Sequence, residues 1–163
     1  MKSLISENLA SSLCYQIAHE RYNSTLYLYI AAFLKNKGLD NLATHFEGQH
    51  DEEIGHSLKI YNILTDLNAP VFIPEVQEVS MEISDIRFIA ETYLNREILT
   101  TESLDEIKHQ AMMEKNCVLE EFMREMIVLQ RAEYAEATDF ADKAEMTGGS
   151  WFNVLLWDLA IGA

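Results

Sequence analysis

Glycine and proline are scarce in this chain, and their placement is the feature that most constrains its fold. The 163 residues include six glycines and two prolines, and both prolines fall between residues 69 and 83. Elsewhere, long segments of helix-forming residues continue without a break and without the apolar and polar alternation that is typical of strands. The sequence therefore predicts an all-α protein.

Five helices are predicted from their start and stop signals. Gly38, for example, follows the first long segment as a C-terminal cap. The predicted helices cover about residues 6–36, 40–68, 84–114, 118–146 and 151–161. We expect one domain over residues 1–163, with a four-helix bundle at about 6–146 and a short C-terminal helix at about 150–161.

The link between the second and third helices differs from the other, short links. Residues 69–83 contain Pro70 and Pro74 and alternate apolar residues with acids, which favours an extended segment. A helix of about 28 residues is ~42 Å long, and fifteen extended residues can cover ~50 Å. The segment can therefore cross the full bundle and make the second and third helices parallel, although an ordinary long loop is the alternative.

The apolar stripe of each long helix is interrupted near mid-length. Apolar residues spaced by three and four mark the face that each helix buries. The polar residues that interrupt these stripes are Glu20 in the first helix, Glu53 and His56 in the second, Glu97 in the third, and Gln130 and Glu133 in the fourth. One such acid could be a boundary residue or an ion-pair partner, but four at the same height indicate a shared site.

Four buried carboxylates in one core require positive charge. Each loses hydration worth several kcal/mol, and the interior stripes have no lysine or arginine at mid-length. Two divalent cations would balance the charge, and Glu53 with His56, at i and i+3, form the ExxH pair of di-metal carboxylate bundles. Mixed oxygen and imidazole ligation suits iron or manganese, with zinc as a competitor, and iron is the leading interpretation.

The chain resembles a non-haem bacterial-type ferritin over nearly its whole length. The similarity extends from residues 19–22 (HERY) through residues 52–56 (EEIGH) to the short terminal helix. The resemblance implies the ferritin-like crossover bundle described above. It also implies two iron ions in each subunit.

The resemblance assigns the first iron to the first two helices. Glu20 and His56 would hold this ion, and Glu53 would bridge to its neighbour. Tyr27, seven residues after Glu20, matches the tyrosine beside the ferritin ferroxidase centre, so Tyr27, Glu53 and His56 are the implied catalytic residues. A packed core tyrosine with a satisfied hydroxyl is the alternative for Tyr27.

The second iron is assigned to the third and fourth helices. Glu97 would hold it, with Gln130 and Glu133 completing its surroundings. Related di-iron proteins have a second ExxH motif in the fourth helix, where this chain has glutamine first and glutamate last. The second iron is therefore expected to be held loosely, which suits a site that passes oxidised iron onward.

Single positions bear on two further features of the family, a haem ligand and a third iron site. Ile54 stands where bacterioferritins carry a haem-ligating methionine, so haem is not expected. Glu52 and Glu133 match ligands of a third iron site, but Leu129 and Ala132 occupy two other positions of that site. A third iron is therefore left open.

The function implied by the resemblance is that of a ferroxidase and iron store. Two ferrous ions would be oxidised by dioxygen or peroxide, and the ferric product would enter a hollow homo-oligomeric shell of twenty-four subunits. One alternative is a non-storage di-iron oxidase or peroxidase, which would require a second ExxH motif or a rubredoxin-like cysteine site. The other is a non-catalytic scaffold, and the central carboxylates argue against it.

Charge and cysteine content exclude several other classes. Twelve basic against 27 acidic residues give a net charge of −15, the wrong sign for nucleic acid or an anionic membrane. Cys14 and Cys117 lie far apart in sequence and are expected to be reduced, buried thiols. With no signal-like apolar N-terminus and no apolar run of about 18 residues, a cytoplasmic protein is expected.

Overall fold

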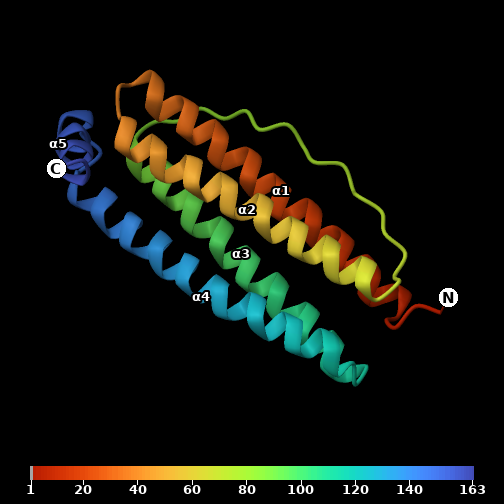
Figure 1. Ribbon diagram of the computed structural model, residues 1–163. Helices are drawn as coiled ribbons and strands as arrows, with labels where there is room; N and C mark the ends of the chain where they lie inside the picture. The colour runs from red at the N-terminus through yellow and green to blue at the C-terminus, as the bar shows by residue number, and fades with distance from the viewer. Residues whose placement is uncertain (1) are drawn as a thin grey trace.

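The computed structural model describes residues 2–163, which contain five α-helices and no strand. The helices are α1 (Glu7–Asn36), α2 (Asp40–Asp66), α3 (Ile86–Met113), α4 (Cys117–Met146) and α5 (Trp151–Ile161). The four long helices form a bundle, and α5 lies at the end of the bundle where α4 finishes (Figure 1). The all-α crossover bundle with a short fifth helix is thereby confirmed. None of these five helices combines the length and apolarity needed to cross a bilayer.

The long link between α2 and α3 crosses the whole bundle. Residues 67–85 return along the outside, so that α2 and α3 run in the same direction (Figure 1). Hydrogen bonds hold this crossover in place: the Tyr29 hydroxyl donates to the Met81 carbonyl at 2.9 Å, and the Phe72 N–H donates to the Cys14 Sγ at 3.5 Å. The bundle therefore has the short, long, short order of links that the sequence predicts.

Three of the four long helices begin at a capping side chain of their own. The side chains of Ser6, Asp85 and Asn116 accept from backbone N–H groups in the first turns of α1, α3 and α4. Helix α2 follows a leucine and has no such cap. The buried Asp158 of α5 replaces it, because its Oδ1 accepts from the Leu42 N–H at 2.7 Å. Helix α5 is thus joined to the start of α2.

The exact helix ends differ from the predicted ones by one or two residues. Helix α2 ends at Asp66, because Asn68 adopts a left-handed conformation with a φ of 52°. Helix α3 starts at Ile86, since Asp85 is its cap residue with extended backbone. These caps depend on backbone angles, which a hydrophobic pattern does not report.

The prediction of two buried cysteines is wrong for Cys117. Both cysteines are free thiols, and Cys14 is buried, but Cys117 is exposed as the first residue of α4. The core of that helix starts two residues later, at Leu119, which is fully buried. The first turn of α4 therefore presents Cys117 to solvent.

The core consists of two apolar clusters at different heights of the bundle. One cluster includes Tyr27, Phe46 and Tyr93, and the other includes Leu13 and Leu104. Along every long helix, buried polar residues separate the part that belongs to one cluster from the part that belongs to the other. The bundle therefore has a polar layer at mid-height between two apolar layers.

Candidate metal centre

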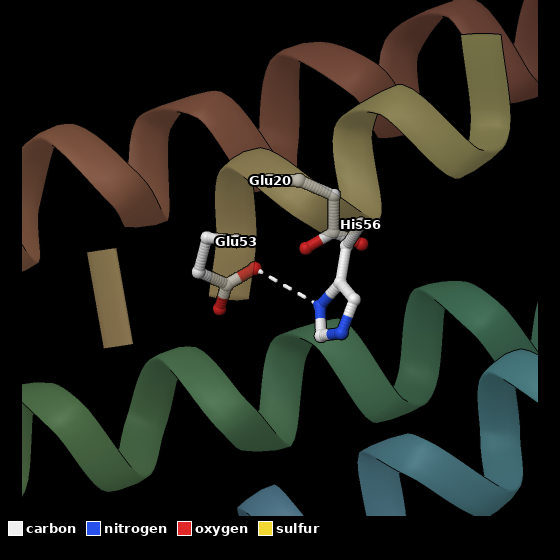
Figure 2. Close-up of side chains that lie close together, drawn as sticks. All are labelled: Glu20, Glu53 and His56. Carbon is white, nitrogen blue, oxygen red and sulfur yellow. Dashed lines mark ion pairs between the residues drawn. The ribbon is translucent and has the colours of Figure 1, made fainter. Parts of the chain in front are cut away.

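Carboxylates from all four long helices meet in this polar layer and form two overlapping groups. Glu20, Glu53 and His56 form the first group, and Glu53, Glu97 and Glu133 form the second. Within each group, one ligand atom from every residue lies within 4.8 Å of the others. Figure 2 shows the side chains of the first group directed toward one another between the helices. Glu53 belongs to both groups and lies between them.

Helix periodicity brings these side chains inward. Glu53 and His56 are one turn apart on α2, and the His56 Nδ1 lies 3.6 Å from the Glu53 Oε2. The His56 Nε2 lies 3.2 Å from Oε1 of Glu133 on α4. Glu20 and Glu97 are fully buried, whereas His56 and Glu133 retain 8% and 7% of their exposure. The side of the layer formed by α2 and α4 is therefore the one nearer to solvent.

The two groups together leave several carboxylate oxygens free for a cation. Gln16 donates its Nε2 to the Glu20 Oε1 at 2.7 Å. No donor among residues 2–163 hydrogen-bonds to Oε2 of Glu20, Glu53 or Glu133, although all three atoms are buried. Buried carboxylate oxygens without donors are rare because they forfeit hydration. These oxygens together with the neighbouring imidazole fit the donor set that iron or another divalent transition metal takes.

The carboxylate of Glu97 is surrounded differently. The Tyr27 hydroxyl donates a short hydrogen bond to its Oε1, and Gln130 donates its Nε2 to the Oε2 at 2.7 Å. Gln130 also donates to the Glu97 backbone carbonyl at 3.2 Å. Both Glu97 oxygens therefore already accept a hydrogen bond. Gln130 therefore enters the layer as a direct hydrogen-bond partner of Glu97.

Burial raises the pKa of every carboxyl group in the two groups. Burial, with repulsion from Glu97 and Glu133, raises the pKa of Glu53 to about 8. Burial, with repulsion from Glu97 and Glu20, raises that of Glu133 to about 9. The pKa values of Glu20 and Glu97 are also raised, chiefly by burial. A cation that binds here must displace protons, which couples its affinity to pH.

His56 is placed to act as a neutral ligand. Burial lowers the pKa of its imidazole below the ordinary value of 6.5. Its contacts with Glu53 and Glu133 are therefore those of an uncharged ring, and a neutral nitrogen is the form that binds metals.

Two residues of the layer are missing from the set predicted by sequence. Gln16, four residues before Glu20, is 2% exposed and holds the Glu20 carboxylate. Asn23, three residues after Glu20, is fully buried, and its Nδ2 lies 3.4 Å from the Glu53 Oε1. Their i−4 and i+3 spacing from Glu20 was the available signal. In an apolar stripe, a neutral amide is a weaker sequence signal of a functional site than an acid is.

A surface pocket between α1 and α3 approaches the layer from the opposite side. Its volume is about 380 Å³, and its polar lining includes Gln16, His19, Ser103 and Glu106. Ser103 donates a short hydrogen bond to the Gln16 Oε1, and Gln16 in turn donates to Glu20. The pocket is thus separated from Glu20 by a single amide side chain.

Comparison with known families gives this layer its context. Residues 10–147 match the family model described as the ferritin-like domain, which covers most of the bundle. The chain belongs to the ferritin-like domain family.

Individual ferritins agree with this assignment. The chain is 29% identical over 139 residues to ferritin BfrB of Mycolicibacterium smegmatis, spanning 85% of this chain and 77% of that protein. It is 32% identical over 90 residues to a bacterial non-heme ferritin of Staphylococcus aureus, a match that spans 55% of this chain and about half, 52%, of that relative. Among solved structures, an open pore ferritin from the archaeon Archaeoglobus fulgidus matches with a TM-score of 0.91 and 26% identity, covering 96% of this chain and 97% of that one.

Two of the four positions that correspond to a third iron site carry residues without ligand atoms. Glu52 lies on the exposed face of α2, next to the buried Glu53. On α4, Leu129 and Ala132 are also exposed and offer no ligand atoms. Glu52 and Glu133 match two of the four positions, Leu129 and Ala132 do not match the other two, and the existence of a third iron site stays open.

Proposed function

We propose that this chain is a ferritin that oxidises ferrous iron at the mid-height carboxylate layer and stores the ferric product as mineral inside an oligomeric shell. The supporting observation is the pair of donor groups that share Glu53. Each group offers three ligand atoms within 4.8 Å, and two adjacent cations bridged by one carboxylate fit that arrangement. Iron is the substrate of the proposed reaction and not a resident cofactor.

The proposed roles of the residues follow from their positions. Glu20 and His56 bind one ferrous ion, Glu97 and Glu133 bind the other, and Glu53 bridges. Each ferrous ion loses one electron, and dioxygen accepts both electrons with two protons to give hydrogen peroxide. When peroxide is the oxidant, two electrons and two protons convert it to two water molecules. The protein contributes ligands, spacing and a partly water-excluded layer.

The two ions are proposed to be held unequally. Both oxygens of Glu97 already accept hydrogen bonds, from Tyr27 and from Gln130. A cation on that side must compete with these donors, whereas the Oε2 atoms of Glu20 and Glu53 have no donor among residues 2–163. Tyr27 is proposed to act on the reaction through Glu97. A loosely held second ion favours release of ferric product over its retention.

Assembly into a shell is the second part of the proposal. The relatives described above are named as ferritins, and the chain matches the open pore ferritin over 97% of that chain's length. Helix α5 exposes a set of large apolar side chains, namely Phe152, Leu155, Leu156, Leu159 and Ile161. Exposed apolar residues in such a group are typical of surfaces that pack against another subunit. We propose a homo-oligomer of twenty-four subunits in the cytoplasm.

The test adds ferrous iron to the apo-protein in air and follows oxygen uptake, ferric absorbance and particle size. The wild-type protein should form a large particle that oxidises many iron ions per subunit. The double variant Glu53→Ala with His56→Ala should keep its helical content and lose fast oxidation. Unchanged oxidation in that variant would refute the site assignment.

The chain offers a matched control for this test. Glu106 and His109 have the same ExxH spacing on α3, but both are exposed. The variant Glu106→Ala with His109→Ala should therefore oxidise iron like the wild type. Retention of only two tightly bound ions per subunit would indicate a non-storage oxidase instead, and absence of any uptake would leave a structural role.

A further inference from the structure

Four polar side chains form a closed cluster behind Glu53, on the side of α1 and α3. We call it the Asn23 cluster, and its members are His19, Asn23, Arg96 and Thr100. Arg96 donates its Nε to the Asn23 Oδ1 at 2.6 Å and its Nη2 to the His19 Nδ1 at 3.2 Å. The guanidinium also stacks over the ring of Tyr22 at 4.8 Å. The stack and the two hydrogen bonds fix the position of Arg96.

The donors and acceptors of the cluster determine the orientation of the Asn23 amide. A guanidinium can only donate, so the Asn23 atom that faces Arg96 must be the oxygen. The Asn23 Nδ2 then points to the other side, where it donates to the Thr100 Oγ1 at 3.0 Å. Thr100 donates its own hydrogen to the Arg96 carbonyl at 3.0 Å, so it is free to accept. A flipped amide would turn its NH₂ group toward the guanidinium and lose the hydrogen bond from Arg96.

This fixed amide faces the carboxylate that both donor groups share. The Nδ2 lies 3.4 Å from the Glu53 Oε1, while the Glu53 Oε2 has no donor among residues 2–163. Asn23 is fully buried, so water does not compete for this contact. The amide thus holds one carboxylate oxygen and leaves the other oxygen directed at the metal positions.

We propose that Asn23 is a positioning residue that sets the orientation of Glu53 and thereby allows one carboxylate to bridge two cations. The inference rests on the proposed metal site and adds a residue outside its ligand set. Outer partners that orient a metal ligand typically change metal affinity by about 10- to 100-fold when they are replaced. Arg96 and Thr100 act one step further out, by fixing the amide.

The experiment titrates zinc into the full-length apo-protein by calorimetry, with helical content and particle size measured on every variant. The wild type should bind two zinc ions per subunit. Asn23→Ala removes the donor to Glu53. Asn23→Asp is nearly isosteric and keeps an acceptor for Arg96, but it puts an oxygen where the donor was. Both variants should bind the second zinc ion about 10- to 100-fold more weakly.

The aspartate variant separates positioning from charge. An added carboxylate beside two cation sites would strengthen binding if charge alone mattered, whereas loss of the donor should weaken it. The matched control is Ser24→Ala, because Ser24 is the next residue of α1, is equally buried, and hydrogen-bonds to His50 instead of a carboxylate. This control should bind both zinc ions like the wild type.

The outcomes are distinct. If the wild type binds fewer than two zinc ions, the proposed metal site fails, and this inference fails with it. If the wild type binds two and both Asn23 variants do so with unchanged affinity, or if Asn23→Asp binds more tightly, only the positioning role is refuted. An equal loss in Ser24→Ala would also refute it, because the effect would then be a general consequence of disturbing α1.

Discussion

The substitution Glu133→Gln should make the stability of the apo-protein less dependent on pH. Burial raises the pKa of Glu133 from an ordinary value near 4.5 to about 9 in the folded protein. Between these values the folded state keeps the proton that the unfolded state releases. The free energy of unfolding of the wild type therefore falls as pH rises, by up to about 1.4 kcal/mol per pH unit for this group.

The magnitude follows from the interval chosen. From pH 5 to pH 7 the contribution of Glu133 to the free energy of unfolding should decrease by roughly 2 to 3 kcal/mol. Glutamine has nearly the same shape and does not titrate, so the variant should gain that amount relative to the wild type over the same interval. The gain is a difference between two pH values, which cancels any constant effect of the substitution on packing.

The assay is urea unfolding of metal-free protein with a chelator present, at pH 5, 6 and 7, with particle size checked at each pH. Glu125→Gln is the control, because Glu125 is an exposed acid on the same helix, and it should show no comparable trend. With zinc bound, the free energy of unfolding of the wild type should instead rise with pH, because zinc replaces the protons at the site. A stability difference between Glu133→Gln and wild type that stays constant with pH would refute the reasoning.

Two further substitutions test other parts of the structure. Gln130→Glu puts a carboxylate at a predicted ligand position of the second ion and frees the Glu97 Oε2, whereas Asn23→Asp adds one behind a ligand; the second zinc ion should therefore bind roughly tenfold or more tightly and stay bound during gel filtration against a chelator, and unchanged retention would contradict the unequal site. Asp158→Ala removes the cap of α2 and should lower the free energy of unfolding by about 1 to 2 kcal/mol and expose α5 to protease, while exposed Asp142→Ala should do neither. Equal protease resistance in both would argue against the anchoring of α5.

Much of the fold follows from the sequence because it depends on periodicity. Apolar spacing of three and four gives the four long helices, and the two prolines in one segment give the crossover between α2 and α3. The helix ends were less predictable. They depend on side-chain caps such as Asp85, and for α2 on Asp158, which is more than a hundred residues away in the chain.

The candidate ligands could be named from the sequence because charge in an apolar stripe is costly. The ExxH spacing occurs at Glu47, Glu53 and Glu106, so the motif alone selects nothing. Only the pair that starts at Glu53 falls on the buried face of its helix at the height of Glu20 and Glu97. The high cost of burying carboxylates together made that coincidence informative.

The tertiary structure alone decided how these groups are oriented. Sequence did not indicate that the Gln130 amide donates to Glu97 and leaves that carboxylate already hydrogen-bonded. It gave no sign that Arg96 on α3 would fix Asn23 on α1, and through it the shared Glu53. Hydrogen bonds are directional and act over about 3 Å, so they depend on the packing of two helices that periodicity does not specify. Periodicity and charge were enough to predict which carboxylates are buried together, whereas the packing of α1 against α3 sets which oxygen of Glu53 remains free among residues 2–163.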